Sequence, residues 1–213
     1  MDLFSPALGA LLEAVGELTD DDFTRPSGCE GWLVRDLVCH FVIDAQDVLI
    51  TLVTPTEDPV THDEVTYWKV SHAPSDDPLA ALTRRLAAAY GEPWMLQHHV
   101  DDVGRAALRA AGLADPAVRV STQDMVLSTS GYLGAYVWEW TLHHLDLVRH
   151  LPHLAGPSAQ ALARCREMFE QIAGRFPAQW SDEDVLLVGT GRRAPTGAER
   201  AELGELEIPF VLG

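Results

Sequence analysis

Side chains that bind divalent metals occur in two parts of the chain, spaced so that two helices could bring them together. Glu139 and His143 lie four residues apart, so on a helix they share one face, with Cβ atoms roughly 5–6 Å apart. A carboxylate oxygen and one imidazole nitrogen do not complete a site, so a third ligand must come from another helix. His40 occupies an inward-facing position of an apolar helical pattern, where an unpaired imidazole would cost desolvation energy. The spacing therefore predicts one divalent metal ion held by His40, Glu139 and His143.

Three protein ligands leave positions open for water or substrate, as in a catalytic zinc site rather than a structural one. Asp44 follows His40 by four residues and Asp146 follows His143 by three, so each acid shares a helix face with one imidazole. We expect these carboxylates to accept the second N–H of each ligand ring and so to support the site. The spacing assigns no side chain as the catalytic group.

Less specific interpretations of the same residues stay open. A Glu and a His at this spacing often form only a surface pair, and a single histidine on an apolar face is often a core residue. Tyr132 and Tyr136 share the helix face of Glu139, so they could line a ligand pocket or simply pack in the core.

Apolar residues recur at helical spacing along most of the chain. The pattern predicts helices over residues 3–18, 31–53, 76–90, 94–112, 132–151 and 159–176. Four or five of them are long enough to form a bundle, which gives a mainly α fold. Residues 54–76 are polar and lack periodicity, which predicts a long surface loop, and residues 117–127 are typical of a short strand or an extended connection.

The end of the chain has a different pattern. Residues 185–190 and 208–212 predict two strands, and Thr196 with Glu199 matches a capping box for a short helix. We therefore expect a metal-binding helical bundle over residues 1–176 and a short α/β appendage over residues 177–213, packed on the bundle.

Composition narrows the class of protein. The 213 residues are 47% hydrophobic, enough for one core with a small appendage. No apolar run approaches the roughly 18–20 residues of a membrane span, and acids stand where a signal peptide is basic, so we expect a cytoplasmic protein without a membrane partner. A net charge of −17 without a basic stripe argues against nucleic acid and leaves a small-molecule substrate, with monomer and homodimer both open. Three cysteines without paired spacing predict reduced thiols: Cys29, Cys39 and Cys165.

Two ordered segments resemble a known family. SGCEGWLVRDLVCHF (27–41) and EWTLHHLDL (139–147) are similar to blocks of the mycothiol-dependent maleylpyruvate isomerase-like family of the DinB superfamily. The tail LLVGTGRRAPTGAERAELG (186–204) resembles that of short actinobacterial members. The resemblance implies a DinB-like four-helix bundle and a divalent metal, usually zinc, at residues matching His40, Glu139 and His143. It also implies a site that activates a low-molecular-weight thiol such as mycothiol, for transfer to an electrophile or for thiol-assisted isomerisation.

The chain departs from that family at its end. The longer isomerases carry a larger C-terminal domain with a catalytic arginine, which this tail is too short to match, and Arg192 and Arg193 are the candidates to replace it. Three functions follow from the sequence: a metal-dependent thiol S-transferase or isomerase, a metal enzyme that needs no thiol, and a non-enzymatic bundle that binds a small molecule or a partner.

Overall fold

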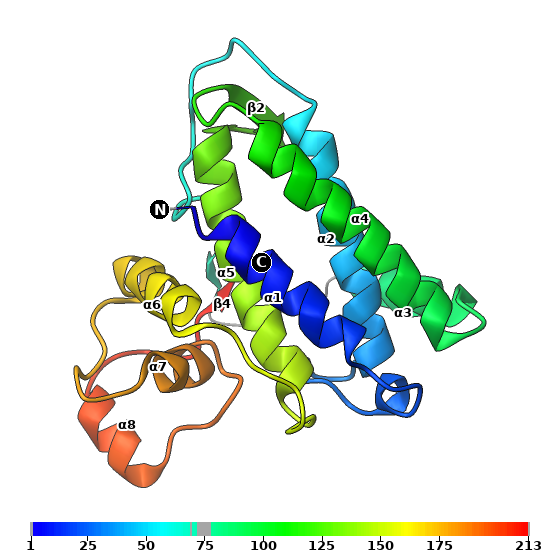
Figure 1. The fold of residues 1–213 in the computed structure, drawn as a ribbon. Helices are drawn as coiled ribbons and strands as arrows, with labels where there is room; N and C mark the ends of the chain where they lie inside the picture. Colours follow the sequence, from blue (N-terminus) through cyan, green and yellow to red (C-terminus); the bar gives the residue numbers. More distant parts are fainter. Residues whose placement is uncertain (1, 69, 72–77, 213) are drawn as a thin grey trace.

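A four-helix bundle forms the centre of the molecule (Figure 1). The computed structural model describes residues 2–68, 70–71 and 78–212. The bundle consists of α1 (Phe4–Gly16), α2 (Val34–Leu52), α4 (Pro93–Leu113) and α5 (Thr129–Val148). Both α1 and α2 pack against α4 and α5, and a further helix, α3 (Pro78–Ala89), packs on α2. The expected mainly α, DinB-like bundle is confirmed.

The bundle helices begin where the sequence offers a cap. The Ser128 hydroxyl accepts a hydrogen bond from the Gly131 amide at the start of α5. The Asp36 carboxylate accepts one from the Leu33 amide at the start of α2, which follows a short 3-10 turn, η1 (Asp22–Thr24). Because these contacts satisfy backbone donors that a helix end leaves free, they fix where each helix starts. The first two residues of the helix predicted over 76–90 lie outside the described residues.

Apolar side chains of α1, α2 and α5 belong to one hydrophobic core. Leu37 and Val48 of α2 and Trp140 of α5 are fully buried, and the ring of Phe4 from α1 meets Trp140 edge-on at 6.4 Å between centroids. Each such side chain contributes roughly 1.5–3 kcal/mol by leaving water. The two helices that carry the predicted ligands therefore both contribute fully buried side chains to the core.

A hairpin closes one end of the bundle and receives the polar loop. β2 (Arg119–Thr122) pairs antiparallel with β3 (Met125–Ser128) through a two-residue turn, Gln123 and Asp124, both with positive φ. Thr61 and His62 donate backbone hydrogen bonds to the hairpin carbonyl of Val126. The predicted loop is therefore, in this part, docked on the hairpin rather than free.

The last described residues return to that same loop. β4 (Val211–Leu212) pairs antiparallel with β1 (Val70–Ser71), so the segment following α2 and the end of the chain share a two-stranded sheet. The predicted strand over 208–212 is thus confirmed in its second half.

Three helices lie beside the bundle (Figure 1): α6 (Ala159–Ala173), α7 (Asp182–Gly189) and α8 (Gly197–Leu203). The capping box at Thr196 and Glu199 starts α8 as predicted. The strand predicted over 185–190 is wrong, because these residues belong to α7. Ser181 caps this helix by accepting from the Asp184 amide, and three acids in its first turn suit the helix dipole. Val185 to Val188 are buried on every side, so the sequence shows an apolar run without helical period.

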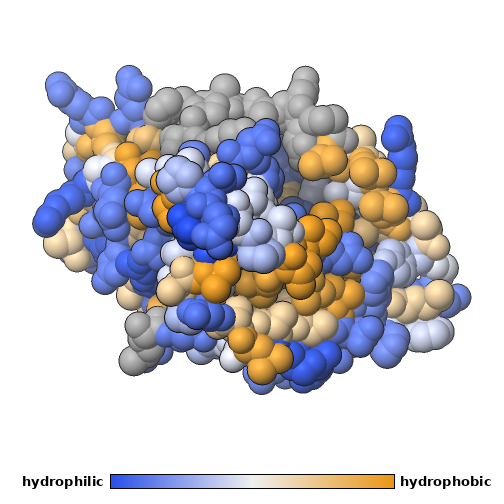
Figure 2. Space-filling model, turned by 90° about the horizontal axis from the view of Figure 1, so that it is seen from above, coloured by the Kyte–Doolittle hydropathy of each residue, from blue (hydrophilic) through white to orange (hydrophobic). Residues whose placement is uncertain are grey.

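Apolar side chains also reach the surface. Seen from above the view of Figure 1, apolar residues adjoin one another over the middle of this face, with polar residues around them (Figure 2). Exposed examples near the C-terminal ends of α2 and α4 are Ile50, Val53 and Leu113. Within the described ranges, none of the helices combines the length and the apolar character that crossing a bilayer requires.

Candidate metal centre

The three predicted ligands converge between α2 and α5. The Nε2 atom of His40 lies 3.2 Å from Oε1 of Glu139, and Nε2 of His143 lies 3.0 Å from the same oxygen. Ligand atoms of the three residues all lie within 4.8 Å of one another. Two helices distant in sequence therefore bring two imidazoles and one carboxylate to a single point.

The donor atoms fit a divalent metal. Zinc ligands about 2.0–2.2 Å from the ion stand roughly 3.3 Å apart in a tetrahedral arrangement. The two nitrogen-to-oxygen distances, 3.0 and 3.2 Å, are close to that spacing. The nitrogen and oxygen donors are also those zinc accepts in catalytic sites, so the residues present suit the ion implied by the sequence.

The site is open to solvent. The side chains of His40, Glu139 and His143 keep 23%, 16% and 15% of their surface exposed. A structural zinc site is closed by four protein ligands, whereas a catalytic site keeps one position for water or substrate. Three partly exposed ligands match the second arrangement.

The charges at this point are strongly coupled. Burial alone would raise the pKa of the Glu139 carboxyl, but the neighbouring His143 and His40 rings outweigh it and lower that pKa. Burial alone would lower the pKa of His143, but Glu139, Cys29 and Asp146 raise it well above its usual range. The chain thus places one carboxylate between two imidazoles, and the charge of each ring acts directly on that carboxylate.

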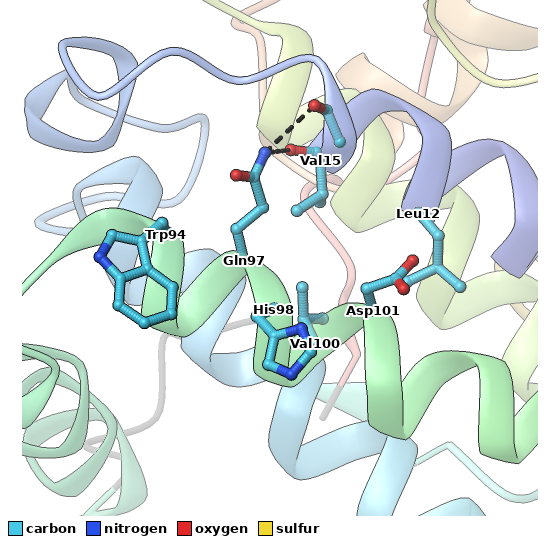
Figure 3. Close-up of a pocket in the computed structure, with 8 residues that line it drawn as sticks. Leu12, Val15, Trp94, Gln97, His98, Val100 and Asp101 are labelled. Carbon is cyan, nitrogen blue, oxygen red and sulfur yellow. Dashed lines mark hydrogen bonds between the residues drawn. The ribbon is translucent and has the colours of Figure 1, made fainter.

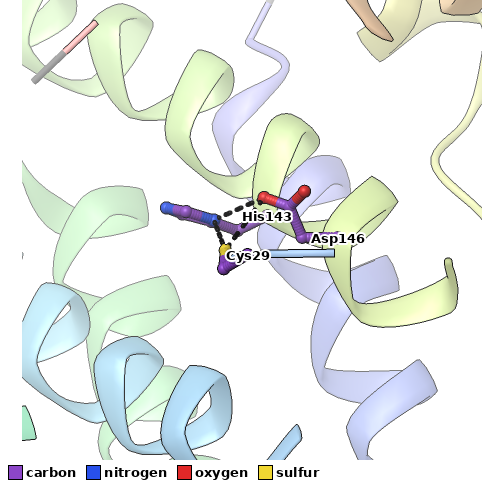
Figure 4. A group of neighbouring side chains, drawn as sticks. All are labelled: Cys29, His143 and Asp146. Carbon is purple, nitrogen blue, oxygen red and sulfur yellow. Dashed lines mark hydrogen bonds and ion pairs between the residues drawn. The ribbon is translucent and has the colours of Figure 1, made fainter. Parts of the chain in front are cut away.

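The second nitrogen of His143 is held by Asp146, as the spacing predicts. Nδ1 lies 2.9 Å from Oδ2 of Asp146 (Figure 4). Asp146 is 2% exposed, and the Arg192 guanidinium donates to both of its oxygens, Nε at 2.9 Å and Nη2 at 2.8 Å. The cation and the ring hold the pKa of Asp146 well below its usual range, although burial opposes this. His143 is therefore oriented by a carboxylate that is itself fixed.

Asp44 lies elsewhere than the spacing predicts. Its Oδ2 atom is 3.2 Å from Nε2 of His40, the same nitrogen that faces Glu139, rather than near the other ring nitrogen. The Asp44 carboxylate lies on the side of the donor atoms because α2 directs Nε2 of His40 toward the bundle interior, where Glu139 and Asp44 both face it. This oxygen is buried without a hydrogen bond, and burial raises the pKa of Asp44 to about 7. Asp44 is thus a neighbour of the donor atoms and does not orient His40 from behind.

Tyr132 and Tyr136 follow the second of their two alternatives and pack in the core. Both rings are buried, and both hydroxyls donate to Oδ2 of Asp47, at 3.2 and 2.8 Å. Their polar ends therefore face a carboxylate one turn beyond Asp44 rather than the donor atoms of His40, Glu139 and His143.

The two candidate arginines point in opposite directions. Arg192 reaches Asp146, whereas Arg193 donates to Asp184 and Glu199 within the appendage. Arg193 is therefore a structural residue and no longer a catalytic candidate. The sequence could not show that Arg192 and Arg193 have different partners. The turn that separates their side chains follows α7, and the sequence did not predict that helix.

Sequence reasoning missed the segment before α2. The Sγ atom of Cys29 lies 3.3 Å from Oδ2 of Asp146 and 3.7 Å from Nδ1 of His143 (Figure 4). The Gly28 amide donates to the Asp146 carbonyl at 2.7 Å, and the Trp32 ring meets His40 edge-on at 5.5 Å between centroids. The signal for these residues was that they belong to the family-like segment 27–41, just ahead of the helix that carries His40.

Burial suppresses the reactivity of the cysteines. It raises the pKa of Cys39 to about 11 and of Cys165 to about 12, and that of Cys29 also rises. For Cys39, two units above its ordinary value mean roughly 100-fold less thiolate. Alkylation by iodoacetamide at neutral pH, followed by mass spectrometry, should therefore be far slower in the folded protein than in urea. A native rate for any of the three equal to its rate in urea would contradict this account.

Two cavities lie away from the ligands. One, of about 240 Å³ between α1 and α4, is lined by Trp94, His98 and Asp101, with Gln97 donating to the carbonyl of Val15 (Figure 3). The other, of about 810 Å³, lies between the start of α1, α5 and α6 and has Arg164 in its wall. Neither cavity is lined by His40, Glu139 or His143, so both are separate from the candidate metal centre.

Comparison with known proteins bears on the same segments. Searches of curated proteins and of solved structures found no match. A family model described as the mycothiol maleylpyruvate isomerase N-terminal domain matches residues 4–148, a range that holds all four bundle helices and the three ligand residues. Since the match covers well over half of the chain, the protein belongs to the mycothiol maleylpyruvate isomerase N-terminal domain family.

Proposed function

We propose that this protein is a divalent-metal-dependent enzyme that activates a low-molecular-weight thiol of the mycothiol type. The activated thiol would either be transferred to a small electrophilic substrate or assist its isomerisation. The observation that carries the proposal is the convergence of His40, Glu139 and His143, each partly exposed, at one point of the bundle. Family membership supports the thiol.

Each residue at the site would have a definite role in this function. His40, Glu139 and His143 would hold zinc, which lowers the pKa of a coordinated thiol so that thiolate is available at neutral pH. Asp146 accepts from His143 and fixes its ring orientation. Trp32 covers one side of His40 and reduces its contact with water.

Metal content tests the first half of the proposal. We expect about one zinc ion per chain in the wild-type protein and almost none in a His40→Ala/His143→Ala variant, measured by elemental analysis after dialysis. A matched control is His98→Ala/His150→Ala, because both of those histidines are exposed on the surface. The control should retain the wild-type content.

A thiol assay tests the second half. Zinc-loaded protein with mycothiol and monochlorobimane should form the thioether faster than the reagents alone, and the double ligand variant should lose this acceleration. Turnover of a substrate without thiol would contradict thiol activation and favour a thiol-independent metal enzyme. A wild-type protein that neither holds zinc nor gains thermal stability from it would favour a non-enzymatic bundle.

A further inference from the structure

The Asp146 carboxylate stands where the bundle and the appendage meet. It accepts from His143 on its own helix and from two nitrogens of Arg192. The Cys29 thiol also points to it, and the Gly28 amide holds the backbone carbonyl of the same residue. A side chain with this many partners has little rotational freedom.

Arg192 reaches this carboxylate because the chain turns sharply after α7. Gly191 has φ of +79°, and a Cβ there would lie 2.7 Å from Cβ of Pro209, so a side chain does not fit. The turn directs Arg192 into the bundle and leaves Arg193 facing the acids of the appendage. The neighbouring Phe210 amide donates to the Gly189 carbonyl at 2.8 Å and secures the turn.

A contribution to folding stability alone does not explain the ion pair between Arg192 and Asp146. Asp146 is almost fully buried, and the Arg192 side chain is 21% exposed. Removing both charges from water costs energy that their attraction only partly returns, so a buried pair is weak evidence for stability. The two-point contact of a guanidinium does, however, define the plane of a carboxylate.

We propose that Arg192 is a positioning residue of the metal centre, acting through Asp146. It holds the Asp146 carboxylate in the orientation that accepts from Nδ1 of His143, and Nε2 of that ring then stays directed at Glu139. The inference rests on the proposed metal function, and it makes a residue outside the matched range 4–148 part of that centre.

The test is a double-mutant cycle on zinc affinity, measured in the full chain by competition with a chromogenic chelator. Arg192→Met and Asp146→Asn should each lower the affinity by roughly 10–100-fold, as loss of a supporting partner of a metal ligand does. The double variant should be no weaker than Asp146→Asn alone, because Arg192 acts only through that carboxylate. Arg192→Lys keeps the charge without the fork and should recover part of the affinity.

Arg193→Met is the matched control, since it removes the adjacent arginine and its contacts within the appendage. It should change zinc affinity less than about threefold while lowering thermal stability, which separates positioning from general loosening. Wild-type affinity in Arg192→Met, additive losses in the double variant, or an equal loss in Arg193→Met would each overturn the inference and leave the proposed function intact. A wild-type protein that binds no zinc would overturn both.

Discussion

The Glu139→Gln substitution is expected to lower zinc affinity by at least about 100-fold, more than the loss of a supporting partner costs. Glu139 supplies the only anionic donor among the three converging residues, and both imidazole Nε2 atoms face its Oε1 atom. An amide of nearly the same shape keeps an oxygen but carries no charge. The two histidines would then meet the ion without the carboxylate that neutralises part of its charge.

Chelator competition and thermal shifts with added zinc measure this effect. The wild-type protein should gain stability as zinc rises above its dissociation constant, and Glu139→Gln should not. Glu13→Gln is the control, because it removes an equal charge from an exposed position of α1. Equal zinc affinities in Glu139→Gln and the wild type would remove Glu139 from the ligand set.

Gly28→Ala should disturb both folding and the metal centre. A Cβ at Gly28 would lie 2.7 Å from Cα and from Oδ1 of Asp146, closer than real contacts allow. The obstacle is the backbone of α5, so the segment before α2 must move and the 2.7 Å bond from the Gly28 amide must stretch. Overpacking of this kind costs roughly 1–3 kcal/mol. Because Asp146 supports His143, zinc affinity should fall as well.

Urea unfolding of the metal-free protein measures the loss of folding stability in Gly28→Ala, and chelator competition measures the loss of zinc affinity. Gly9→Ala is a control of opposite sign: no atom lies within 4 Å of its added Cβ, and it lies inside α1. It should stabilise the protein by about 0.5–1 kcal/mol without changing zinc affinity. Should Gly28→Ala unfold at the wild-type urea concentration, the close approach to Asp146 would not be the constraint described above.

The bundle and the convergence of His40, Glu139 and His143 were predictable because helical periodicity and residue chemistry coincide in these segments. α2 and α5 are long, their apolar faces repeat at helical spacing, and an inward histidine on one needs a polar partner on the other. The distances between His40, Glu139 and His143 came only from the structure, since sequence fixes the face of a helix but not the rotation of an imidazole.

The sequence did not predict those features that lack helical or strand periodicity. The second half of α7, Val185–Gly189, is buried at every position, so its apolar run has no helical period and predicts a strand. The turn that separates Arg192 from Arg193 follows this helix and was therefore not predicted either. Cys29 and Asp44 were missed or misplaced for another reason. Their roles depend on which ring nitrogen they face, and that is decided by tertiary packing rather than by spacing.

The order of residues along the chain also separates two stages of assembly. All three ligands are complete once residue 143 has been synthesised, but Arg192 and the β4 strand that pairs with β1 come close to the end. Since chains fold from their N-terminal part during synthesis, the bundle can collect its donor atoms before the residues that steady them exist. The side chains of His40, Glu139 and His143 can therefore come together before Arg192 is present to hold the Asp146 carboxylate.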